Sequence, residues 1–156
     1  MKRFLVSGMA AFALVLSAPA ALAELETSPL TIESANGDHV FTVEIADDPE
    51  EITTGLMNRE SMDADAGMLF DFGQPREAAM WMKNTLIPLD MVFADSEGVV
   101  ISVHENAVPG DLTPIPSAGE AQYVLEINGG LAAQLGIAEG SEMQHPRISD
   151  AAWPCE

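Results

Sequence analysis

Short apolar runs separated by turn-forming residues make up most of this chain. The first two runs after residue 24 predict a pair of strands joined by the turn Asn36-Gly37-Asp38. The segments 89–94 and 98–105 predict a second hairpin, with Gly98 at a position that accepts a positive φ. Further strands are expected at 68–72, through 80–84, at 121–128 and before residue 145.

Two short helices interrupt the predicted strands. Asp48 is a good N-cap, Pro49 suits the first helical position, and Glu50 and Glu51 lie at the positive end of the helix dipole. This pattern predicts a helix near 48–57. A second helix is expected near 129–135, ending at Gly136. The pattern therefore predicts a mainly β, single-domain antiparallel sandwich or barrel of at least six strands with one or two short helices.

The first 23 residues have the pattern of a Sec-type signal peptide. Lys2 and Arg3 precede a short apolar run that ends in Ala21-Leu22-Ala23, a small-x-small cleavage signal. Cleavage after Ala23 predicts an exported protein, periplasmic or extracellular, with no membrane association of the mature chain. The expected organisation is a signal peptide at 1–23, one β-rich domain at 24–146 and a C-terminal tail at 147–156.

Charge narrows the choice of partners. The chain holds 25 acidic against 6 basic side chains. Lys2 and Arg3 lie in the leader, so the mature chain carries four basic side chains and a formal charge of −21. Such a surface repels nucleic acid and anionic lipid, so neither is expected as a partner. The single cysteine, Cys155, excludes an internal disulfide. The sequence favours no particular oligomeric state.

Lys83 is the most unusual residue of the mature chain. We expect the strand through 80–84 to be covered on both faces, with Trp81 and Lys83 pointing to one side. Met80, Met82 and Asn84 would then point to the other side.

A buried ammonium needs an acidic partner. Asp90, beyond a turn at Pro88, is the first choice for that partner. Glu126 and Glu44, each inside an apolar strand, are the next choices.

Two other roles for Lys83 stay open. In one, Trp81 forms the wall of a pocket and Lys83 reaches a small anionic or hydroxylated ligand. The residues that would bind this ligand are Trp81, Lys83, Asn84, Asp90, Glu126 and Glu44. In the other, burial lowers the pKa of Lys83 and the amine becomes catalytic. The surrounding carboxylates argue against a catalytic lysine because they would keep it protonated.

Methionines raise the question of copper. Thioethers bind Cu(I), and His104 on a neighbouring strand could join Met68, Met80, Met82 and Met91. Methionine also fills irregular cores, and these residues lie in segments expected to be buried. We therefore expect core packing and neither a metal site nor a cofactor.

Four segments resemble the exported bacterial family called domain of unknown function 192. They are GLMNRESMDADAGMLFDF, MWMKNTLIPLDMVF, GVVISVHENAVP and VLEINGGLAAQLGI, within residues 38 to 144. The resemblance implies a small, mainly antiparallel β fold of jelly-roll type and no established activity. Some members carry a cysteine after the position of Asn106, where this chain has Pro109 and Gly110, so no thiol role is available there.

Two functions remain open, and the sequence does not decide whether the protein is an enzyme. The first is a ligand-binding or accessory module with a polar site near Trp81, Lys83 and Asp90. The second is a hydrolase or lyase acting on saccharide or cell-wall material, in which Glu44, Asp90 or Glu126 acts as general acid or base. Two acids facing each other across a cleft would favour the enzyme, and acids held by cations or backbone donors would favour the binding module.

Overall fold

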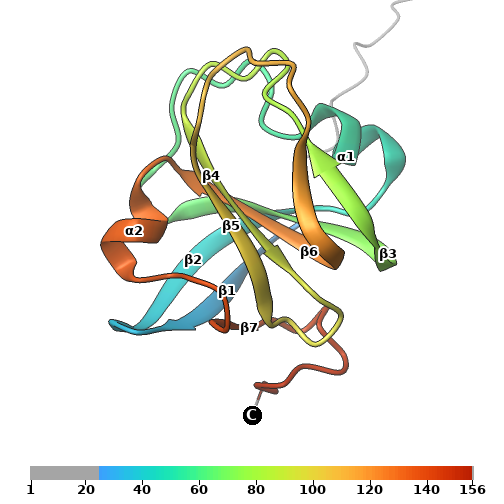
Figure 1. The fold of residues 1–156 in the computed structure, drawn as a ribbon, viewed down its shortest axis with the longest axis vertical. Helices are drawn as coiled ribbons and strands as arrows, with labels where there is room; N and C mark the ends of the chain where they lie inside the picture. Colours follow the sequence, from blue (N-terminus) through green and yellow to red (C-terminus); the bar gives the residue numbers. More distant parts are fainter. Residues whose placement is uncertain (1–24, 156) are drawn as a thin grey trace, which may run out of the picture.

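Seven strands form one curled sheet in the computed structural model, which describes residues 25–155 (Figure 1). The elements are β1 (Thr27–Ser34), β2 (Gly37–Ala46), α1 (Pro49–Thr54), β3 (Ala66–Met80), β4 (Leu89–Ala94), β5 (Val100–Ala107), β6 (Ile115–Asn128), α2 (Leu131–Leu135) and β7 (Glu142–Gln144). The mainly β class and both helices are confirmed. The predicted signal peptide lies outside the described residues.

The sheet has the order β5-β4-β6-β3-β2-β1-β7. It is mixed because β2 and β3 pair in parallel, whereas the other neighbours pair antiparallel. A bridge between Val99 and Glu142 brings the start of β5 close to β7, so the sheet curls into a half-barrel. The predicted jelly-roll arrangement is not confirmed, because all seven strands belong to this one sheet.

Each face of the sheet carries its own apolar core. On β6, Leu125 and Ile127 belong to the core that contacts α2, while Val124 belongs to the core that contacts α1. This division follows from the alternation of side chains along a strand. The two helices lie on opposite sides of the sheet in Figure 1. Among residues 25–155, no helix combines the length and apolar character needed to cross a bilayer.

The predicted capping of α1 is confirmed. The Asp48 side chain accepts hydrogen bonds from the backbone N–H groups of Glu50 and Glu51, at 2.8 and 2.9 Å. The Glu51 carboxylate in turn accepts from the Asp48 N–H, which completes a capping box. Pro49 occupies the first turn. These contacts fix the residue at which α1 begins.

The segment around Lys83 is not a strand. β3 is longer than predicted and runs through the expected loop at 73–77, but it ends at Met80. Residues 83–84 form a turn in which Asn84 has φ of 54°. The loop from 81 to 88 then leads into β4, so the expected burial of Lys83 on a covered strand is wrong.

Asp90 joins three parts of the chain through one fully buried carboxylate. Its Oδ1 accepts from the backbone N–H groups of Asn106 at 2.7 Å and Gly130 at 2.9 Å. Its Oδ2 accepts from the N–H of Ala132 at 2.8 Å. The start of β4, the end of β5 and the first turn of α2 are therefore held together by backbone donors. The predicted pairing of Asp90 with Lys83 is wrong.

We expect Asp90→Asn to lower the free energy of unfolding by roughly 1–3 kcal/mol, because the new amide group faces a backbone donor that it cannot accept from. Asp90→Ala should cost more, since all three donors lose their acceptor. Urea unfolding at pH 7 measures both effects. Asp111→Asn is the matched control, because Asp111 accepts the N–H of Thr113 in an exposed turn. Equal losses at Asp90 and Asp111 would contradict the structural role of Asp90.

Closure of the half-barrel depends on Gly98, which has φ of 79°. A Cβ at this position would lie 2.9 Å from the backbone oxygen of Met143, next to the bridge between Val99 and Glu142. Gly98→Ala should destabilise the protein through both the left-handed backbone and this clash.

Gly73→Ala is the control for backbone strain alone, because Gly73 has φ of 74° and open space around it. The strain should cost each variant roughly 1–2 kcal/mol. The clash should cost Gly98→Ala roughly 1 kcal/mol more in thermal or urea unfolding. Equal stability of the two variants would contradict an added cost from the contact between the new Cβ and the backbone oxygen of Met143.

Candidate functional site

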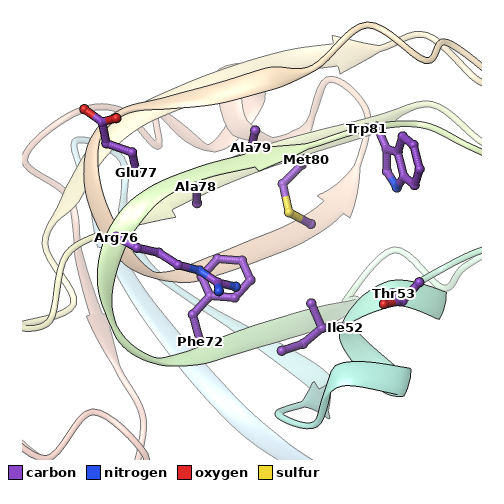
Figure 2. A pocket seen from close by; sticks show the side chains of 9 residues that line it. All are labelled: Ile52, Thr53, Phe72, Arg76, Glu77, Ala78, Ala79, Met80 and Trp81. Atoms are coloured by element: carbon purple, nitrogen blue, oxygen red, sulfur yellow. The ribbon is translucent and has the colours of Figure 1, made fainter.

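A groove opens between α1 and the far half of β3. It has a volume of about 330 Å³ and is lined by Ile52 and Thr53 of α1, Phe72, the segment 76–80 and Trp81. Figure 2 shows Ile52 opposite Met80 in its middle, with Arg76 and Phe72 at one end and Trp81 at the other. The middle of the groove is therefore apolar and both ends are aromatic.

Each end of the site carries a cation over an aromatic ring. The guanidinium carbon of Arg76 lies 3.9 Å from the centroid of the Phe72 ring. The Lys83 Nζ lies 5.0 Å from the centroid of the Trp81 ring. Within residues 25–155, neither cation has a carboxylate oxygen within 4.0 Å. Both stay available to a ligand, held by their rings.

A narrow well extends the groove toward the sheet. Its volume is about 30 Å³, and it shares Ile52, Thr53, Met80 and Trp81 with the groove. Lys83, Thr85 and the loop after α1 complete its walls, and Glu126 of β6 lines it. The well has room for roughly two or three atoms the size of a water molecule.

Glu126 is a buried acid for which residues 25–155 supply no partner. Its side chain is 4% exposed, and its register neighbours are Met68 on β3 and Met91 on β4. No described residue donates a hydrogen bond or forms an ion pair with its carboxyl group. Burial alone raises the pKa of Glu126 to about 8. The neutral form of this carboxyl therefore predominates at pH 7.

The structure brings together only part of the predicted site. Trp81, Lys83 and Glu126 line the same well. Lys83 is exposed, in contrast to the burial expected from the sequence. Its predicted bond to a carboxylate is not found among the described residues, either with Asp90 or with Glu126 or Glu44.

Asn84 and Glu44 lie outside the well and have structural contacts. The Asn84 carbonyl accepts from the Asn58 N–H at 2.8 Å, which ties the loop 81–88 to the loop after α1. Glu44 forms a bidentate pair with Arg59, and one of its two hydrogen bonds measures 2.6 Å. This contact raises the pKa of Arg59.

The methionines divide between core and groove. Met68, Met82 and Met91 are buried in the core that faces α1, as predicted. Met80 is half-buried and lines both the groove and the well. Within residues 25–155, no group of three or more His, Cys, Asp or Glu side chains is placed to hold a metal ion.

Sequence reasoning did not identify Arg76, Phe72 or Ile52 as site residues. Phe72 and Arg76 flank Gly73 and Pro75, which were interpreted as a loop. One available signal was the scarcity of cations, because Arg76 and Lys83 are half of the basic side chains after residue 23.

Comparisons with known proteins agree with the resemblance found in the sequence. A protein from Sinorhizobium meliloti, proposed to be a transcription regulator, is 43% identical in its crystal structure, with a TM-score of 0.76 over 79% of this chain and 96% of that one. A protein of unknown function from Novosphingobium aromaticivorans is also 43% identical, with a TM-score of 0.76 over 82% of this chain and 93% of that one. Comparison with curated proteins gives no match.

The sequence profile of DUF192, a family described as Uncharacterized ACR, matches residues 31–145. This match spans both halves of the sheet, α1 and α2, and it includes every residue of the groove and the well. The chain therefore belongs to the DUF192 family.

Proposed function

We propose that this protein is an exported ligand-binding or accessory module whose groove and well bind a small anionic or hydroxylated molecule. Export rests on the leader pattern at residues 1–23. The binding site rests on one observation: Arg76 and Lys83, the described cations without a carboxylate partner, both line this cavity system.

The acidity of the chain gives this observation its weight. The protein carries 25 acidic side chains, and the other described arginines, Arg59 and Arg147, are both ion-paired. Arg76 and Lys83 instead contact aromatic faces at the mouth of a cavity. A cation kept without a carboxylate in a strongly negative field is available to an anionic group of a ligand. The Phe72 and Trp81 rings offer apolar faces on which a sugar ring or an alkyl chain can pack.

The alternative is a hydrolase or lyase, and it has weaker support. Such an enzyme commonly needs two carboxylates facing one substrate. Of the three acids proposed for that role, Glu44 pairs with Arg59 and Asp90 accepts three backbone N–H groups. Only Glu126 lines the well. Acids held by a cation or by backbone donors are unavailable for acid–base catalysis, so this arrangement favours the binding module.

The transcription-regulator role proposed for the Sinorhizobium protein is not extended to this chain. A formal charge of −19 opposes binding to the phosphate backbone of DNA. A small-molecule ligand agrees better with this charge and with a groove of about 330 Å³.

A direct test uses the chain from residue 24 and four probes, D-galacturonate, succinate, N-acetylglucosamine and inorganic phosphate, in thermal-shift assays at pH 6. A bound probe raises the melting temperature according to its concentration relative to its Kd. We expect at least one of the acidic probes to bind, and binding to weaken as salt is added. No shift with any probe would contradict the proposal.

Variants locate the site. Lys83→Gln should weaken binding of the acidic probe by roughly tenfold or more, because a charge-assisted contact is lost. Lys83→Arg should retain most of the affinity. Arg147→Gln removes the same charge at a residue that lines neither the groove nor the well, and it should bind like the parent protein. Calorimetry measures all three, and equal affinity of Lys83→Gln and Arg147→Gln would contradict a role for Lys83. Lys83→Gln should fold with nearly unchanged stability, because Lys83 is exposed.

A further inference from the structure

The floor of the well holds a single acid in an apolar setting. Glu126 shares one face of the sheet with Met68 and Met91, its direct neighbours on β3 and β4. Phe70 and Leu56 also line the well. An ionised carboxylate without a partner is costly in such surroundings, and the neutral acid is the form that this site tolerates.

The charged groups nearest to Glu126 along the sheet form no ion pair with it. On β2, Glu44 lies in the same cross-strand row beyond Met68 but is neutralised by Arg59. On β5, His104 lies beyond Met91 and is exposed.

Besides Glu126, one charged residue of the described chain lines the well. The residues of α1 that line the well, 52–54, are uncharged. From the loop 81–88, Lys83 is the only charged residue in the lining, and its ammonium contacts the Trp81 ring. Among the described residues, Lys83 has no carboxylate oxygen within 4.0 Å, so it forms no ion pair with Glu126, and burial is the cause of the raised pKa of Glu126.

We infer that Glu126 is the recognition group of the well, a neutral carboxyl that donates a hydrogen bond to an ionised carboxylate at one end of the ligand. This inference rests on the proposed function and adds the chemical class of the ligand. A neutral carboxyl is the only form of Glu126 that has a proton to donate. A hydrogen bond from O–H to an oxyanion is short and strong, and Lys83 at the rim supplies the compensating positive charge.

Size favours a carboxylate over larger anions. The well holds about 30 Å³, roughly enough for the two oxygens of a planar carboxylate. A tetrahedral phosphate group needs more room. The rest of the ligand would lie in the groove, along Met80 and toward Arg76. The site is therefore suited to an elongated organic acid or an acidic sugar.

The direction of the pH dependence follows from the proton on Glu126. Above the pKa of about 8 the acid ionises, loses its donor and repels the carboxylate. Affinity should stay constant from pH 6 to pH 7 and then fall, approaching tenfold per pH unit well above pH 8.

Calorimetric titration with D-galacturonate and with succinate from pH 6 to pH 9.5 tests this dependence. Glu126→Gln keeps a neutral donor of the same shape, so it should bind with an affinity that does not change with pH. Lys83→Arg keeps its positive charge over this range and should keep the pH dependence of the parent protein, which assigns that dependence to Glu126.

Stability without ligand gives a second readout. In the unfolded chain the Glu126 carboxyl ionises near its ordinary pKa of 4.5, whereas in the folded protein it keeps its proton up to about pH 8. This carboxyl therefore stabilises the folded state less as pH rises from 4.5 to 8. Glu126→Gln removes that loss, so urea unfolding should show the variant gaining stability relative to the parent between pH 5 and pH 8. A pH-independent difference would overturn the inference.

The outcomes separate this inference from the proposed function. If an acidic probe binds equally well at pH 6 and pH 9.5, or if Glu126→Gln keeps the pH dependence of the parent protein, the inference fails and the binding module stands. If phosphate binds and neither carboxylate does, the ligand class is wrong. If none of the probes binds at pH 6, both proposals fail.

Discussion

The Asp90 carboxylate is the contact on which the arrangement around the site depends. Asp90 belongs to β4, and its carboxylate accepts hydrogen bonds from backbone N–H groups at the end of β5 and at the start of α2. The residue before it, Leu89, also pairs with Asn128 of β6, so the loop 81–88 enters the sheet at one fixed point. That loop carries Trp81 and Lys83, and Asp90, which does not line the well, holds the strand into which the loop leads.

Three acids lie in apolar strands, and each has a different hydrogen-bonding environment. Asp90 is satisfied by backbone donors, Glu44 is satisfied by the Arg59 guanidinium, and Glu126 lacks a partner among the described residues. Hydrogen bonds from N–H groups and from an arginine favour the charged form of a carboxyl, whereas burial without them favours the neutral form. The sequence motifs VEI and LEI around Glu44 and Glu126 look alike, yet Glu44 meets an arginine and Glu126 lies between two methionines.

Local signals predicted local structure well. Asp48, Pro49 and Glu51 specify the start of α1 within four residues, and Gly98 marks the tight turn of the second hairpin. The incorrect predictions concern residues whose structure depends on contacts with distant parts of the chain. Nothing near Lys83 shows that Asp90 faces backbone donors 16 to 42 residues away, so a short link between the two looked plausible. Gly73 and Pro75 suggested a loop, but pairing of Arg76 with Ala121 and of Met80 with Ile115 extends β3 through them.

The same extension of β3 creates the groove. Beyond Gly73 the strand continues with β6 away from the curled part of the sheet, and α1 packs beside it through Ile52. The gap between helix and strand is bordered by partly buried and exposed side chains, which include Phe72, Arg76 and Trp81. A well that reaches from this gap to Glu126 opens onto the one buried acid of the described strands that no donor satisfies. Buried polar groups in folded proteins usually find a partner, and this is the physical ground on which we propose that a ligand supplies the one missing at Glu126.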